Sequence, residues 1–280
     1  MSGNVFKAPD GSALTTKIKR EEIPATLTKL EQILREFGIE EIATIGSAGK
    51  KAESGDLDVA VGPVMAMDDD ERQLYKQTLR TNLSSRLGAE NVALVGDNVH
   101  LRFPIAGRET EGSGDPDHVQ IDLMLSQDPS NTAWLMAGTG AGLKGVFRNL
   151  LLAFIAKVRS IQTGKTYTLK FPGGIQVLNP DGEVVVNRSE VPQTILDQLM
   201  LNASPNDLLT FDDLLSVAER DPDIRQALRQ GIPTAKVPDF IGYVSRYTKN
   251  DINSYNLVVK ALGSEATLRE SIRQILRVLR

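Results

Sequence analysis

The spacing of apolar residues predicts alternating helices and strands in the first half of the chain. Apolar residues recur every three or four positions after Pro24 and stop near Gly38, which predicts a helix, and residues 69–87 form a more polar helix. Strands are expected over 42–45, 57–61, 92–95, 99–103 and 119–125. In the strands over 57–61 and 119–125, apolar and polar residues alternate, so each strand has one buried and one polar face.

The second half of the chain is predicted to be mostly helical. A nearly all-apolar helix is expected over 143–161, followed by strands within 166–171 and 175–186. A turn at 179–182 divides the second of these stretches. Residues from about 190 onward are predicted to be helical, and the last helix carries its apolar face over 268–279. Residues 1–22 are polar and are expected to form a loose leader.

Composition excludes several classes of protein. The chain has 280 residues, of which 41% are hydrophobic and 24% are charged, as in ordinary globular proteins. It contains no cysteine and two histidines, so disulfides, thiolate metal sites and a three-histidine metal site are excluded. The longest apolar run, Leu150 to Ala156, is far shorter than the ~18 residues of a membrane span. A cytoplasmic protein without a membrane segment is expected.

Charge is distributed unevenly along the chain. The net charge is −4, but residues 129–180 contain no acidic residue and carry Lys144, Arg148, Lys157, Arg159, Lys165 and Lys170. This segment could balance the acidic remainder or face phosphates, and we favour phosphates, with Lys144 and Arg148 as the contacts.

Three aspartates are expected to share one face of a sheet. Asp56 and Asp58 are two residues apart on a strand, and Asp122 occupies the polar face of a later strand. Carboxylates that converge on one face repel each other unless cations lie between them. Magnesium prefers such oxygen ligands and often binds phosphates as well. The pattern therefore predicts a two-ion site for chemistry at phosphorus.

A candidate phosphate cradle lies directly upstream of these acids. Gly46 and Ser47 follow a predicted strand, so the backbone can approach a phosphate and its N–H groups can point toward it. Ser47 adds a hydroxyl donor, while Lys50 and Lys51 add positive charge. Ser47 could instead act as a simple helix cap and Lys50 as a solvated lysine.

The segment that contains both the phosphate cradle and the first two acids reads Ile45-Gly-Ser-Ala-Gly-Lys-Lys-Ala-Glu-Ser-Gly-Asp-Leu-Asp-Val-Ala-Val61. It resembles the motif of the DNA polymerase β-like nucleotidyltransferase superfamily, most of all its family X polymerases. His118-Val-Gln-Ile-Asp-Leu123 is similar to the strand that carries the third acid, and Thr139-Gly140-Ala141 to a turn near the nucleotide. The chain departs from family X at Gly49 and Lys51, and it has no helix-hairpin-helix for DNA.

The resemblance implies a fold and four regions. The fold class is α+β (α/β), with a catalytic palm built on a mixed twisted sheet that has helices on one side. We expect a polar leader over 1–22 and a nucleotidyltransferase catalytic domain over 23–128. A smaller basic α/β subdomain that binds substrate or nucleotide follows over 129–192, and a helical C-terminal region over 193–280.

The resemblance also implies a reaction and its residues. A nucleoside monophosphate is moved from an NTP or dNTP to an acceptor hydroxyl, and pyrophosphate is released. Asp56, Asp58 and Asp122 would bind two Mg²⁺ ions, with Mn²⁺ as a substitute. The triphosphate would contact Gly46, Ser47, Lys50 and Lys51, and the nucleotide would contact Thr139 and Gly140. The expected acceptor is a nucleic-acid 3′ end. Transfer to a protein or small-molecule hydroxyl, and a non-enzymatic nucleotide-binding regulator, stay open as alternatives.

Overall fold

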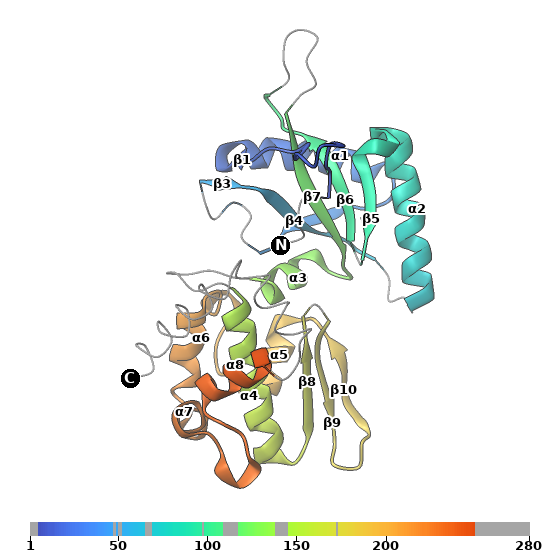
Figure 1. Cartoon of the computed structure of the whole chain (residues 1–280). Coiled ribbons are helices and arrows are strands. Elements are labelled where there is room, and N and C mark those ends of the chain that lie inside the picture. Colours follow the sequence, from blue (N-terminus) through green and yellow to red (C-terminus); the bar gives the residue numbers. More distant parts are fainter. Residues whose placement is uncertain are drawn as a thin grey trace. The chain divides into compact units, whose positions relative to one another are not determined.

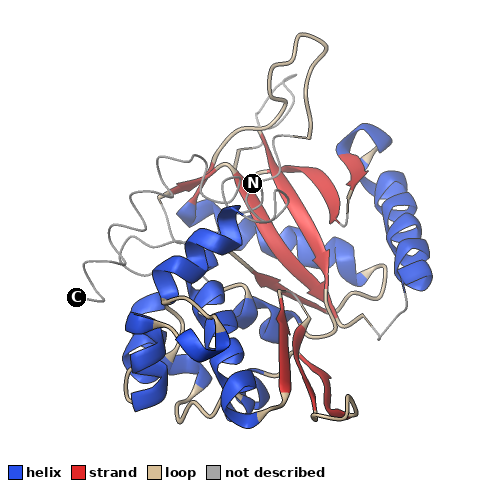
Figure 2. Ribbon diagram, turned by 60° about the horizontal axis from the view of Figure 1, so that its bottom comes forward, coloured by secondary structure: helices blue, strands red, loops and turns tan. Residues whose placement is uncertain are grey.

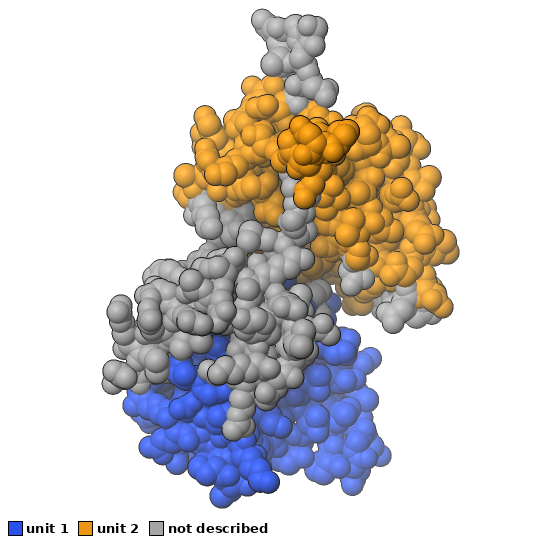
Figure 3. Space-filling model, viewed as in Figure 1, with its two compact units in different colours: residues 1, 134–280 blue, residues 2–133 orange. Residues whose placement is uncertain are grey.

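The structure, a computed structural model, forms two compact units, residues 2–133 and residues 134–280, which we call the N-terminal and C-terminal units (Figure 3). It describes residues 5–46, 49, 52–64, 69–96, 98–108, 117–137, 145–171 and 173–249. The catalytic, basic and C-terminal regions predicted from the sequence stay predictions.

A five-stranded mixed sheet forms the centre of the N-terminal unit (Figure 1). Its strands, in spatial order, are β2 (Glu41–Thr44), β4 (Asp56–Gly62), β7 (His118–Leu125), β6 (Asn98–Pro104) and β5 (Val92–Val95). Only the pairing of β4 with β7 is parallel, and the other three are antiparallel. The mixed sheet of the predicted α+β fold is therefore confirmed.

Two helices cover one face of this sheet, α1 (Ile23–Arg35) and α2 (Asp69–Leu87). Leu30 and Leu34 of α1 and Leu79 and Leu83 of α2 join one hydrophobic core with alternate residues of the strands. From β4 these are Leu57, Val59 and Val61, and from β7 Val119, Ile121, Leu123 and Leu125. Because side chains alternate along a strand, the residues between them project from the opposite, polar face of the sheet.

The segment from residue 5 to residue 22 packs against the N-terminal unit instead of forming the loose leader expected from its polar sequence. Phe6 and Ile18 are buried. The short strand β1 (Ile18–Lys19) pairs with β3 (Glu53–Ser54), and Thr16 donates its amide to the carbonyl of His118. The short helix η1 (Arg20–Glu22) then leads into α1. These contacts join residues far apart in sequence, so the local pattern does not contain them.

The C-terminal unit is built around the long helix α4 (Gly145–Thr163), labelled in Figure 1. Helices and strands are distinguished by colour in Figure 2. Phe147, Leu151 and Phe154 of α4 lie in a core that also contains Ile175 and Val177. An antiparallel sheet of β8 (Thr166–Lys170), β9 (Gly174–Leu178) and β10 (Val184–Ser189) and a series of helices complete this unit. The helices are α5 (Pro192–Gln198), α6 (Phe211–Ala218), α7 (Pro222–Gln230) and α8 (Phe240–Lys249).

Shorter elements connect the larger ones. Helix α3 (Pro129–Leu135) spans the boundary between the units, and η2 (Ala89–Asn91), η3 (Pro205–Asp207) and η4 (Pro233–Ala235) are single 3-10 turns. The apolar helix predicted over 268–279 lies outside the described residues. Within the part of the chain that the structure describes, no helix has the length and apolarity needed to cross a membrane.

Candidate active site on the polar face of the central strands

The strand register brings the three predicted acids to one face of the sheet. In the parallel pairing of β4 with β7, Asp58 lies opposite Asp122 and Asp56 lies opposite Gln120. Directly opposite residues of paired strands project to the same side, and residues two apart on a strand share a face. Asp56, Asp58 and Asp122 therefore occupy neighbouring positions on the polar face, away from α1 and α2.

The acids influence each other electrostatically. Burial, together with the negative charges of Asp56 and Asp122, raises the pKa of Asp58 to about 6. Burial and the charge of Asp122 also raise the pKa of Asp56. Both shifts have the direction expected when carboxylates crowd together without a cation.

Asp122 is held by two side-chain donors. The Nδ1 atom of His100 lies 2.6 Å from its Oδ1, and Nε2 of Gln120 donates to the same oxygen over 2.8 Å. Gln120 is held in turn by the amide of Val5, which donates to its Oε1 over 2.8 Å. His100, Gln120 and Asp122 are each 2% exposed. Burial alone would lower the pKa of His100, but the hydrogen bond and the charge of Asp122 raise it.

Gly46 comes close to the same acids from the end of β2. Its φ of +65° lies in the left-handed region that favours glycine. A Cβ atom at this position would lie 3.3 Å from Oδ2 of Asp58. The neighbouring Ile45 donates its amide to the carbonyl of Asp58, which fixes the end of β2 beside β4. The glycine therefore allows a turn of the backbone directly beside one of the three acids.

The donor set suits a divalent cation, although the described residues form no ready-made cage. Within the described ranges, no three His, Asp or Glu side chains are arranged to hold a metal ion. Magnesium usually binds through one or two carboxylates, several waters and substrate phosphates, so it does not require an all-protein cage. Three acids on one face, two of them with a raised pKa, fit such an ion.

Of the remaining predicted ligands, Arg148 lies within the described residues and six lie outside them. Ser47, Lys50, Lys51, Thr139, Gly140 and Lys144 lie outside the described residues. Their roles stay predictions.

Arg148 lies in the C-terminal unit and is 1% exposed. Its Nε donates to the carbonyl of Leu208 over 2.7 Å, and its guanidinium lies 4.3 Å from the centre of the Trp134 ring. Nη1 and Nη2 are buried and have no hydrogen-bond partner among the described residues. Burial lowers the pKa of Arg148 to about 10. Its contact with a phosphate stays a prediction, and the side chain is part of the interior.

Sequence reasoning missed His100 as a site residue. The other histidine, His118, lies at the start of β7. In the structure His118 pairs with Pro104, whereas His100 lies directly opposite Asp122. The alternation over 99–103 predicted the strand, but it did not reveal which residue of the next strand each position faces.

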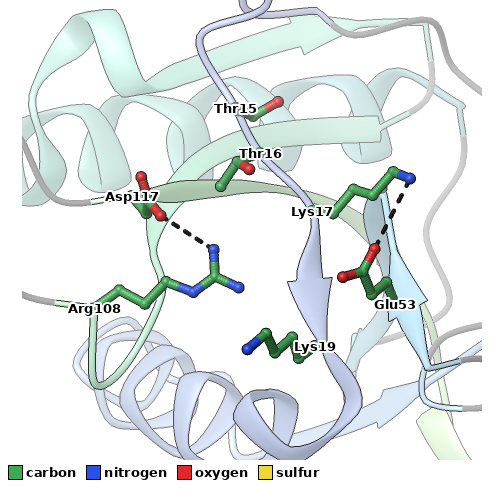
Figure 4. A pocket seen from close by; sticks show the side chains of 8 residues that line it. Thr15, Thr16, Lys17, Lys19, Glu53, Arg108 and Asp117 are labelled. Carbon is green, nitrogen blue, oxygen red and sulfur yellow. Dashed lines mark hydrogen bonds and ion pairs between the residues drawn. The ribbon is translucent and has the colours of Figure 1, made fainter.

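An open pocket lies on the surface of the N-terminal unit beside β1 and β3 (Figure 4). It is lined by Thr15, Thr16, Lys17, Lys19, Glu53, Gly55, Arg108 and Asp117. Arg108 makes a two-pronged ion pair with Glu22, at 2.8 Å for both bonds, and a further pair with Asp117 at 3.1 Å. The positive charges of this pocket are thus largely compensated within the protein.

The comparison with known proteins shows a likeness to a solved structure. No protein-family profile and no curated protein matches the chain. The fold is similar to that of a polymerase β from Leishmania infantum, solved as a ternary P/T complex. The TM-score is 0.43 at 15% sequence identity, and the match covers 69% of this chain and 77% of that chain. This likeness concerns the course of the backbone and assigns no residue a role.

Proposed function

We propose that the protein is a metal-dependent nucleotidyltransferase, and that the acidic face of β4 and β7 is its active site. The observation that carries the proposal is the parallel register, which sets Asp58 beside Asp122 with Asp56 on the same face. Burial and the charges of Asp56 and Asp122 raise the pKa of Asp58, so a bound cation would stabilise its ionised carboxylate.

The proposed reaction joins the acceptor oxygen to the α-phosphorus of an NTP or dNTP. The bond between that phosphorus and the bridging oxygen breaks, and pyrophosphate leaves with the bonding electrons. Asp56, Asp58 and Asp122 would hold two Mg²⁺ ions, which would stabilise the charge that develops on the attacking and leaving oxygens. Asp122 would also help to remove the proton of the attacking hydroxyl.

The other residues of the proposal bind and orient the nucleotide. The left-handed turn at Gly46 leads the chain away from β2 beside Asp58, so Ser47, Lys50 and Lys51 follow it as candidates for the triphosphate. Thr139 and Gly140 are proposed to contact the sugar and base, and Lys144 the phosphates. The proposed acceptor is a nucleic-acid 3′ hydroxyl, because the segment 129–180 is basic and without acids.

Incorporation of α-phosphate-labelled nucleotides tests the proposal. Wild-type protein, Asp58→Asn and the exposed-acid control Glu90→Gln are incubated with each nucleotide, Mg²⁺ or Mn²⁺, and a labelled primer. We expect primer extension by the wild type and the control and none by Asp58→Asn. Label on protein or on a small molecule would move the acceptor to the alternative class. No transfer with any nucleotide and either metal would refute the proposed activity.

A further inference from the structure

The third acid of the site differs from the other two in how it is held. Among the described residues, no side chain donates a hydrogen bond to Asp56 or Asp58, and both are partly exposed. Asp122 is buried and accepts hydrogen bonds from His100 and Gln120 on the same oxygen, Oδ1. Rotation of its carboxylate would break both bonds, so its orientation is set by the protein.

The ring of His100 is itself fixed at both ends. Its Nδ1 faces Oδ1 of Asp122 at 2.6 Å, and its Nε2 faces the carbonyl of Val95 at 3.3 Å. Since a carboxylate accepts hydrogen bonds, Nδ1 carries the proton of the short contact. The antiparallel pairing of β6 with β7 sets His100 opposite Asp122, which keeps the two side chains within reach.

This arrangement is the one that proteins use to orient a ligating group through a second residue. A metal ligand is commonly held by a hydrogen bond to a neighbouring side chain, which fixes its direction and tunes its affinity. In the usual case a carboxylate accepts the hydrogen bond of a ligating histidine. Here the histidine donates to a carboxylate that is itself the candidate ligand. A donor buried to 2% exposure cannot be replaced by solvent without rearrangement of the strands.

We propose that His100 is a positioning residue, whose Nδ1–H holds Oδ1 of Asp122 so that the carboxylate is already oriented when metal and nucleotide bind. The inference rests on the proposed function, since it assigns His100 to the same site. His100 touches neither substrate nor metal in this proposal.

Three variants separate positioning from packing. His100→Asn keeps a donor near the place of Nδ1, His100→Phe keeps the volume of the ring but removes the donor, and His118→Asn changes the only other histidine. Circular dichroism and thermal unfolding first establish that each variant is folded. Mn²⁺ affinity of the nucleotide-free protein is then measured by calorimetry, and kcat and KM for the nucleotide by labelled transfer.

We expect His100→Phe to lose about 10- to 100-fold in Mn²⁺ affinity and in kcat, with KM for the nucleotide nearly unchanged. His100→Asn should recover most of this loss, and His118→Asn should behave as the wild type. A folded His100→Phe with wild-type Mn²⁺ affinity and kcat would overturn the inference. Equal losses in the Phe and Asn variants would also overturn it, since they would show that the ring packs but does not position.

A spectroscopic test keeps the inference separate from the proposed activity. In the metal-free wild type, the Nδ1 proton of His100 should give a slowly exchanging, downfield NMR signal that disappears in Asp122→Ala. Absence of this signal would refute the positioning role even if the protein transfers nucleotides. If the signal is present but the wild type neither binds Mn²⁺ nor transfers nucleotides, the proposed function is refuted. The hydrogen bond from His100 to Asp122 would then be confirmed without a role in metal binding.

Discussion

Replacement of Asp58 by asparagine should make the metal-free protein more stable while it removes activity. Burial and the charges of Asp56 and Asp122 raise the pKa of Asp58 from its ordinary 3.8 to about 6. The folded state therefore binds this proton more tightly than the unfolded state. The stability that this proton provides is fully present below pH 4 and is lost as pH rises through 6.

The size of the effect follows from the two pKa values. The difference between about 6 and 3.8, at about 1.4 kcal/mol per pH unit, corresponds to a cost of about 3 kcal/mol for the ionised carboxylate at pH 8. Asparagine has nearly the same shape and no charge, so Asp58→Asn should raise the free energy of unfolding at pH 8 by up to about this amount. The same substitution removes a proposed metal ligand, and we expect at least a ~10³-fold loss of transfer.

Urea denaturation in the presence of a chelator measures the stability change. Wild type, Asp58→Asn and Glu90→Gln are compared at pH 4 and pH 8 by circular dichroism. Asp58→Asn should exceed the wild type at pH 8 and match it at pH 4, while Glu90→Gln should stay within about 0.5 kcal/mol at both. If Asp58→Asn gained nothing at pH 8, neither burial nor the neighbouring carboxylates would disfavour the ionised form of Asp58, and the argument for a cation beside it would fail.

Three further substitutions test other parts of the structure by urea denaturation. Gly46→Ala places a side chain at a φ of +65° and should lower stability by about 1 to 2 kcal/mol; an unchanged midpoint would contradict the left-handed turn. Thr26→Val removes the hydroxyl that accepts a hydrogen bond from the buried amide of Ala106, and it should lower stability by about 1 to 3 kcal/mol. Thr26→Ser keeps this hydroxyl and should retain most of the stability. Arg159→Met breaks a 2.7 Å ion pair with Asp221 and should cost about 2 kcal/mol or more; a neutral result would show that the pair contributes nothing.

The fold of the N-terminal unit was largely predictable because its strands alternate cleanly. In β4 and β7, apolar and polar positions alternate, so the polar face and its three aspartates followed from the sequence. The pairing of Asp58 with Asp122 could not be predicted from the sequence, because β4 and β7 are separated by α2, β5 and β6 along the chain. Strand order depends on long-range packing, and local periodicity carries no information about it.

The segment without acids shows where composition misleads. Arg148 was predicted to contact phosphates, yet Arg148 and Arg159 both lie inside the C-terminal unit. Each donates Nε to a backbone carbonyl far along the chain, that of Leu208 or Leu199. A carbonyl acceptor is present at every residue, so no side-chain pattern shows which arginines will be buried in this way.

The two hydrophobic cores have no residue in common. A mutation that alters the volume of a side chain in one of them is compensated by neighbours in that same core. A substitution that changes side-chain volume in one core is therefore expected to leave the packing of the other core unchanged.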